Sequence, residues 1–236
     1  CQEGHREIAS LLIDAGARVN CVEKSLCTPL HQACRSGDAE IVKLLISKNA
    51  LLNERNIFGS TPLMLASQSQ NLEVIKVLLA VGAKVNISNR EGMSPLHFCA
   101  QTGNVEIAKL LLEKGSLVNT VTYRHESTPL WTAIQQGSFD VAKELINANA
   151  DVHKAAIVNG LRITPIEKAK FIGNKNMVKL IQQELDWQRR KPLYQMRLWN
   201  DWKENKAHRP TFLGRFLSDK NDVEGRNIRE IIATFL

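Results

Sequence analysis

Short apolar stripes recur along the chain, and each pair of stripes is introduced by a Thr or Ser followed by a Pro. In residues 41–45, 74–79 and 105–111, apolar side chains return every three or four positions, a spacing typical of an amphipathic helix. A Thr or Ser caps a helix, and Pro is tolerated at the first helical position. The motifs that predict these helix starts are Thr28-Pro29-Leu30-His31, Thr61-Pro62-Leu63-Met64, Ser94-Pro95-Leu96-His97, Thr128-Pro129-Leu130-Trp131 and Thr164-Pro165-Ile166-Glu167.

The motif returns at a nearly constant period, with its prolines 33, 33, 34 and 36 residues apart. Gly37, Gly103, Gly137 and Gly173 follow the first stripe of their units, where glycine can close a helix in the left-handed conformation. A single pair of short helices cannot bury its apolar face, whereas stacked pairs can. The pattern therefore predicts an all-α solenoid, a wholly helical array of helix-turn-helix units with short hairpin loops.

The Thr-Pro-Leu-His opening, the later Gly and the closing Lys-Leu-Leu-x-x-Gly-Ala-x-Val-Asn resemble ankyrin repeats. Asn49, Gln70 and Asn149 stand where the pattern has Gly, and Asn tolerates the left-handed conformation, so we expect the backbone to be kept. The resemblance covers residues 1–187 and implies a half repeat at 1–20, full repeats at about 21–53, 54–86, 87–119 and 120–153, and a degenerate repeat at 154–187, with a separate segment at 188–236.

The resemblance implies a protein partner, held on the concave face that the hairpin fingertips and the first helices form. Ile57 and Phe58 stand out there, because interface energy concentrates at large anchoring side chains. The alternative is that Phe58 packs back onto the adjacent hairpin. We expect the fingertips, including Cys27, Ser60 and Ser127, to be exposed. The predicted partner-binding residues are Lys24, Ser25, Arg35, Ile57, Phe58, Gln68, Arg90, Glu91, Met93, Gln101, Arg124, His125 and Gln135.

The sequence gives little support to the hypothesis of an enzyme or of a metal site. The phosphate-binding, dinucleotide-binding and nucleophile-elbow motifs are absent. Cys27, His31 and Cys34 could begin a metal site, but zinc needs four ligands and no fourth is evident. The resemblance instead makes His31 a buried side chain bonded to the neighbouring loop, and Trp131 takes that position in its own repeat, where its indole N–H could replace one such bond. We predict no enzyme activity, cofactor, metal or small-molecule substrate.

The asparagines that close the units are expected to form hydrogen bonds within the loops between repeats. In proteins of the resembling family such asparagines can also be hydroxylated, which stays an alternative. They are Asn20, Asn53, Asn86 and Asn119.

Charge and cysteine content refine the picture. The net charge is +7, and residues 188–236 hold 11 basic and 6 acidic side chains against 20 and 18 in residues 1–187. Five cysteines without a Cys-x-x-Cys pair favour a reducing compartment, which predicts a cytoplasmic location with a nuclear one possible. The apolar runs are too short to span a bilayer. Because the chain opens inside a repeat, we expect the natural protein to extend upstream of Cys1.

The segment 188–236 is basic and rich in aromatic side chains, and we expect a helix to open at Pro192. One interpretation is a cap over the last repeat, where Phe171 and Ile172 take positions that are usually polar. A second is a docking segment for a ubiquitin-ligase component. A third is a contact with nucleic acid or an anionic membrane. The residues expected to form the cap are Trp199, Trp202, Phe212 and Phe216.

Overall fold

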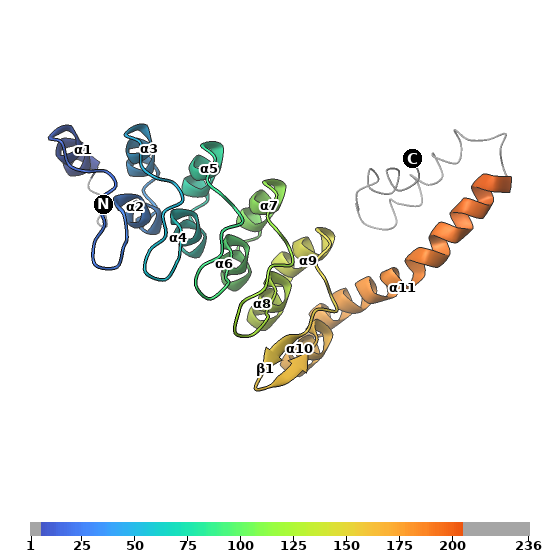
Figure 1. Ribbon diagram of the computed structural model, residues 1–236. Coiled ribbons are helices and arrows are strands. Elements are labelled where there is room, and N and C mark those ends of the chain that lie inside the picture. The colour runs from blue at the N-terminus through green and yellow to red at the C-terminus, as the bar shows by residue number, and fades with distance from the viewer. Residues whose placement is uncertain (1–5, 205–236) are drawn as a thin grey trace. The chain divides into compact units, whose positions relative to one another are not determined.

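The computed structural model describes residues 6–204 of the 236, with side chains as far as residue 192. Pairs of antiparallel helices recur along the chain, which confirms the predicted all-α solenoid (Figure 1). The first helices of the pairs are α2 (Pro29–Ser36), α4 (Pro62–Gln68), α6 (Pro95–Thr102), α8 (Pro129–Gln136) and α10 (Pro165–Ile172). The second helices are α1 (Arg6–Asp14), α3 (Ala39–Ser47), α5 (Leu72–Ala80), α7 (Val105–Glu113), α9 (Phe139–Asn147) and α11 (Lys175–Glu204).

The chain divides into two compact units, residues 1–181 and 182–236, and the stacked repeats lie in the first. Within it, each first helix packs on the first helix of the next repeat, and the second helices from α1 to α9 stack likewise. Leu30, Leu63, Leu96 and Leu130 take the same place in successive repeats and are at most 1% exposed. Each contributes roughly 1.5–3 kcal/mol through burial, so the stack is stabilised one repeat interface at a time.

Capping side chains and left-handed residues set the helix ends as the sequence predicts. Thr28, Thr61 and Thr128 each accept a hydrogen bond from the backbone N–H three residues further on. Gln70 adopts φ +58° at the point where the other first helices end at a glycine. The backbone thus keeps the repeat geometry although the residue departs from the pattern.

Neighbouring hairpins are joined by a ladder of backbone hydrogen bonds, in which the tip of each hairpin donates an N–H to a carbonyl of the hairpin before it. Asn56 and Asn89 shape their own tips, since each side-chain Oδ1 accepts two backbone N–H groups from within its hairpin. The tips are therefore fixed both internally and to each other. The ladder bonds are Ile57 N to Ser25 O at 2.8 Å, Arg90 N to Phe58 O at 2.9 Å, Tyr123 N to Glu91 O at 2.9 Å and Ile157 N to His125 O at 2.7 Å.

The expectation of a wholly helical array is wrong in the last repeat. Strands β1 (Ala156–Val158) and β2 (Leu161–Ile163) form a two-stranded antiparallel sheet with Ala156 opposite Ile163. The two residues between the strands, Asn159 and Gly160, have φ values of +50° and +81°. An Asn-Gly pair with positive φ makes the tight turn that matches the twist of a hairpin, so this hairpin extends into paired strands.

The expectation that a helix opens at Pro192 is also wrong, because Pro192 lies inside α11, which begins at Lys175. Residues 175–204 contain no glycine, unlike the loops that end α5 and α7 at Gly82 and Gly115. The last second helix therefore continues past residue 187, although an internal Pro costs about 3 kcal/mol. Phe212 and Phe216 lie outside the described residues, as do the side chains of Trp199 and Trp202. The cap, ligase-docking, and nucleic-acid or membrane interpretations of this segment stay predictions.

Candidate partner-binding groove

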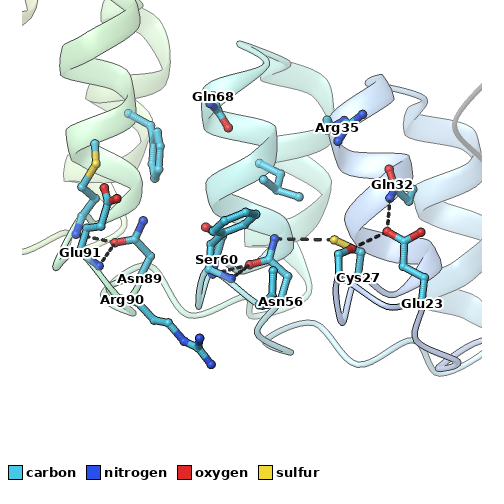
Figure 2. Close-up of a pocket in the computed structure, with 16 residues that line it drawn as sticks. Glu23, Cys27, Gln32, Arg35, Asn56, Ser60, Gln68, Asn89, Arg90 and Glu91 are labelled. Atoms are coloured by element: carbon cyan, nitrogen blue, oxygen red, sulfur yellow. Dashed lines mark hydrogen bonds between the residues drawn. The ribbon is translucent and has the colours of Figure 1, made fainter.

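A groove of about 650 Å³ runs along the fingertips and first helices of the repeats at 21–53, 54–86 and 87–119 (Figure 2). Its walls come from the hairpin tips on one side and from α2, α4 and α6 on the other. Eight of the predicted partner-binding residues line it together. They are Ser25, Arg35, Ile57, Phe58, Gln68, Arg90, Glu91 and Met93.

The five other predicted residues do not line this groove, although all of them are exposed. Lys24 lies on the first hairpin, Gln101 on α6 and Gln135 on α8, while Arg124 and His125 lie on the fourth hairpin. These residues continue the same side of the repeat stack without closing a common cavity with the eight.

Ile57 and Phe58, called the apolar pair below, form an exposed apolar part of the groove wall. Ile57 is 41% exposed and Phe58 is 68% exposed. The alternative in which Phe58 packs back onto the adjacent hairpin is therefore wrong. Both residues take part in the backbone ladder, one to the hairpin before and one to the hairpin after. The pair is consequently presented to solvent on a fixed backbone.

The polar end of the groove is organised around Glu23, which the sequence did not single out. Glu23 Oε1 accepts hydrogen bonds from Ser25 Oγ at 2.6 Å and from Gln32 Nε2 at 2.9 Å. The bond from Ser25, followed by that from Gln32, holds the pKa of Glu23 below its ordinary value, so the carboxylate stays ionised. Figure 2 shows Arg35 on the helix beside this cluster and Arg90 extending from the tip of the third hairpin.

His31 and His97 are fully buried, as predicted. Each Nδ1 accepts the backbone N–H of the residue that caps its helix, at 3.1 Å, which leaves Nε2–H to donate to a carbonyl of the next hairpin at 3.0 Å. Burial lowers the pKa of both side chains, that of His97 to about 4, so both rings are neutral near pH 7. Each imidazole therefore locks a hairpin to the helix before it, and His31 does so for the hairpin that carries the apolar pair.

Because of the same histidine hydrogen bonds, two residues that were expected to be exposed are buried. Ser60 and Ser127 supply the carbonyls that the histidines bind, and they are only 6% and 7% exposed. A fingertip residue whose carbonyl must reach a buried ring is drawn inward, so both serines are buried, although Ser60 still lines the groove. Ser25, Cys27 and Met93 are half-buried rather than fully exposed.

Trp131 does not replace the histidine hydrogen bond. Its side chain is buried, and its indole nitrogen finds no partner among the described residues. The ring instead lies beneath Lys168, whose Nζ is 4.9 Å from the ring centroid. A cation above an indole face is an attractive arrangement. Trp131 thus contributes to the repeat stack through packing and through the contact of its ring face with Lys168.

The closing asparagines form hydrogen bonds in the loops between repeats, but the bonds join consecutive loops, whereas bonds within one loop were predicted. Asn20 Nδ2 donates to Asn49 O at 3.1 Å while its Oδ1 accepts from Leu51 N at 2.9 Å. Asn86 and Asn119 form the equivalent pairs of bonds with their own neighbouring loops, and Asn53 Oδ1 accepts from Lys84 N. These bonds give the asparagines a structural role. Their hydroxylation stays a prediction.

The sequence also missed Tyr123, which is 70% exposed. Tyr123 donates to the hairpin before it just as Ile57 and Arg90 do, so it takes their place in the ladder, and Arg124 is an inserted residue. The 34-residue spacing between Pro95 and Pro129 showed that an insertion exists, but not where it lies. Leu65 and Phe98, which also line the groove, were overlooked because they lie within the apolar stripes of their helices.

Within residues 6–204, no group of three or more His, Cys, Asp or Glu is placed to hold a metal ion. Cys34, considered as a ligand with Cys27 and His31, is fully buried, and burial raises the pKa of its thiol, so the thiolate that metals prefer is disfavoured. Among the described helices, none is long and apolar enough to cross a membrane.

Stacked helix pairs joined by a hairpin ladder define a repeat solenoid. A model of ankyrin repeats in three copies matches residues 1–89 and 81–156, and the chain belongs to the ankyrin-repeat family. Ankyrin repeats are generally protein–protein interaction modules, and the family is typically non-catalytic. A comparison with curated proteins gives no match.

Proposed function

We propose that this chain is a non-catalytic scaffold or adaptor that binds a partner protein in the groove, with the apolar pair as its anchor. The observation that carries this proposal is the exposure of Ile57 and Phe58 side by side on a hairpin tip. Large adjacent apolar side chains are unfavourable in water unless a partner covers them. Aromatic anchors are also where binding energy concentrates.

The fixed backbone beneath the pair supports the same conclusion. Binding is weakened when loops must be ordered, and the ladder bonds on both sides of this hairpin have already ordered it. The other exposed residues on this side, Lys24, Gln101, Arg124, His125 and Gln135, would extend the contact beyond the groove. The four cysteines within residues 6–204 are free thiols, which supports a reducing compartment such as the cytoplasm.

The test is quantitative affinity capture from a host lysate with the full chain and two matched double variants. Ile57→Ser/Phe58→Ser removes the apolar pair, whereas Val81→Ser/Leu117→Ser removes two similarly exposed apolar residues, 44% and 59%, that do not line the groove. We expect the first variant to lose the captured partner and the second to retain it. Equal capture by both would refute the groove as the binding site.

A further inference from the structure

The last hairpin of the stack differs from the earlier ones in what meets its outer edge. Each earlier hairpin offers one carbonyl, from Ser25, Phe58, Glu91 or His125, and the tip of the next hairpin donates an N–H to it. Among the described residues no further hairpin follows β2, because the chain continues into α10 and then into α11 as far as Glu204. Figure 1 shows the β1–β2 hairpin at the end of the row of hairpins. The ladder therefore ends at an edge that no described hairpin covers.

The backbone of Arg162 forms this edge. Its partner across the sheet is Ile157, whose N–H donates to His125 O at 2.7 Å and whose backbone oxygen lies 3.1 Å from His125 Nδ1. Ile157 thus turns both of its backbone groups away from β2. Residues that face each other in this way in an antiparallel pair both point their backbone groups outward, so the N–H and C=O of Arg162 point away from β1. Neither group has a hydrogen-bond partner within residues 6–204.

The side chains beside this edge divide into an apolar face and a charged face. Leu161 and Ile163 lie on the same face of the sheet as Ala156, because side chains alternate along a strand and Ala156 is paired with Ile163. Leu161 is 68% exposed. Arg162 lies on the other face, where its guanidinium is 3.5 Å from Glu126 Oε2. A strand added to β2 would therefore place its alternate side chains beside Leu161 and Ile163, where apolar residues fit.

The charge of Arg162 disfavours a second copy of this chain as the added strand. β2 is bounded by the turn at Gly160 and by Thr164, whose N–H donates to Glu167 Oε2 at 2.8 Å, so Arg162 supplies the outward backbone groups of this strand. Two copies that paired edge to edge would set one Arg162 directly opposite the other, and like charges placed opposite each other destabilise a strand pair. A strand from another protein need not carry a positive charge at that position.

We propose that the edge of β2 binds an extended segment of another protein, which adds to the hairpin as a third strand. The segment has apolar side chains at two alternate positions, beside Leu161 and Ile163, and a residue without positive charge between them, opposite Arg162. Its backbone exchanges hydrogen bonds with the N–H and C=O of Arg162, and its alternate side chains give the specificity. These residues do not line the groove, so the proposal does not rest on the groove being a binding site.

The first measurement is amide hydrogen exchange in the full chain alone, followed residue by residue with NMR. Ile157 is the internal control, because its N–H is bonded within the ladder while that of Arg162, directly across the sheet, points outward. After correction for intrinsic rates, we expect the amide of Arg162 to exchange at least about tenfold faster than that of Ile157. Equal protection of the two amides would mean that this chain or a second copy already covers the edge, and the proposal would then be wrong.

The binding probe is an acetylated and amidated peptide of Ser and Thr with one Val on each side of its central Thr. It is titrated into the isotope-labelled full chain, and the amide signal of Arg162 reports binding. One control peptide is methylated at the backbone nitrogen of the central Thr, which removes the donor for Arg162 O. A second has Thr in place of both Val. We expect saturable binding of the probe, and binding about tenfold weaker for each control.

Matched variants test the edge from the side of the protein. Arg162→Pro removes the outward N–H, and Pro is tolerated at an edge position whose N–H faces away from the neighbouring strand. Arg162→Gln keeps the N–H and is its control. We expect the Pro variant to bind the probe about tenfold more weakly, and the Gln variant to change by less than about twofold. Leu161→Thr keeps a strand-forming residue but removes the apolar contact, so it should also weaken binding and tests the site if the Pro variant does not fold.

Several outcomes would overturn the proposal: no saturable shift of the Arg162 amide, equal binding of the methylated peptide, unchanged binding by Leu161→Thr, or self-association of the full chain that Arg162→Pro abolishes. The last result would place a second copy on the edge. The proposed function is judged separately, since Ile57→Ser/Phe58→Ser should bind the strand probe as the natural chain does and lose only the partner captured by the groove.

Discussion

Mild acid should destabilise the repeats through His97. The ring is fully buried, and burial, opposed only in part by the bond to Ser127, lowers its pKa to about 4 from 6.5. Between the folded pKa of about 4 and the unfolded pKa of 6.5, the unfolded chain binds a proton at His97 that the folded protein does not bind. The free energy of unfolding therefore falls as the pH falls, by at most about 1.4 kcal/mol per pH unit, which amounts to about 2 kcal/mol between pH 7.0 and pH 5.0. Burial also lowers the pKa of His31, which adds to the loss of stability at low pH.

Urea unfolding at pH 7.0 and pH 5.0 measures this effect in the natural chain and in His97→Gln, whose amide does not titrate. We expect the stability of the natural chain to drop by at least about 2 kcal/mol, and that of the variant to drop by about 2 kcal/mol less. His153→Gln, at an exposed histidine, is the control. Carboxylates such as Asp38, with a pKa lowered in the fold, lose their stabilising effect only below about pH 4, outside this window.

Two results would refute the reasoning. One is an equal loss of stability in His97→Gln and the natural chain between pH 7.0 and pH 5.0. The other is an imidazole titration of His97, followed by NMR in the folded protein, with a midpoint near 6.5. Either result would mean that the ring accepts a proton without disturbing its hairpin, and that burial does not keep it neutral.

The other predictions concern the hairpins and the C-terminal segment. Gly92→Ala should lower the free energy of unfolding by roughly 1–3 kcal/mol more than Gly115→Ala in urea unfolding, because its added Cβ would lie 2.8 Å from Val121 O, whereas Gly115 shares the positive φ without a neighbour within 4 Å. Polar substitution of the apolar pair should change stability by less than about 1 kcal/mol, since exposed tips add little to the core. Deleting residues 188–236 should speed proteolysis of the last repeat, because the cap interpretation assigns that segment to cover Phe171, which is 87% exposed among the described residues; unchanged proteolysis would contradict the cap.

The repeat fold could be predicted because each unit carries its own start and stop signals. Thr28, Thr61 and Thr128 cap helices where the sequence motif places them, and Gln70 takes the left-handed conformation expected at its position. These are local effects that operate within a few residues. Stacking then repeats the same helix pair along the chain, so a correct prediction for one unit applies to the others.

The details that could not be predicted depend on contacts between repeats. The spacing of the prolines shows one extra residue in the fourth repeat, but only the bond from Tyr123 to the preceding hairpin identifies Arg124 as the insertion. Ser60 was expected at the surface because its distance from the buried ring of His31 is a property of the stack. The paired strands of the last repeat had a local signal in Asn159-Gly160, and it was overlooked because the repeat pattern was extended over it.

The candidate site could be located for a related reason. The hairpin tips are held by backbone bonds and by buried rings, and the side chains of Ile57, Phe58 and Arg90 contribute nothing to those bonds. The fold therefore places few demands on these three residues, and polar residues would serve it equally well. An apolar pair exposed at a hairpin tip is costly or neutral for the isolated protein, which supports the proposal that a partner covers it.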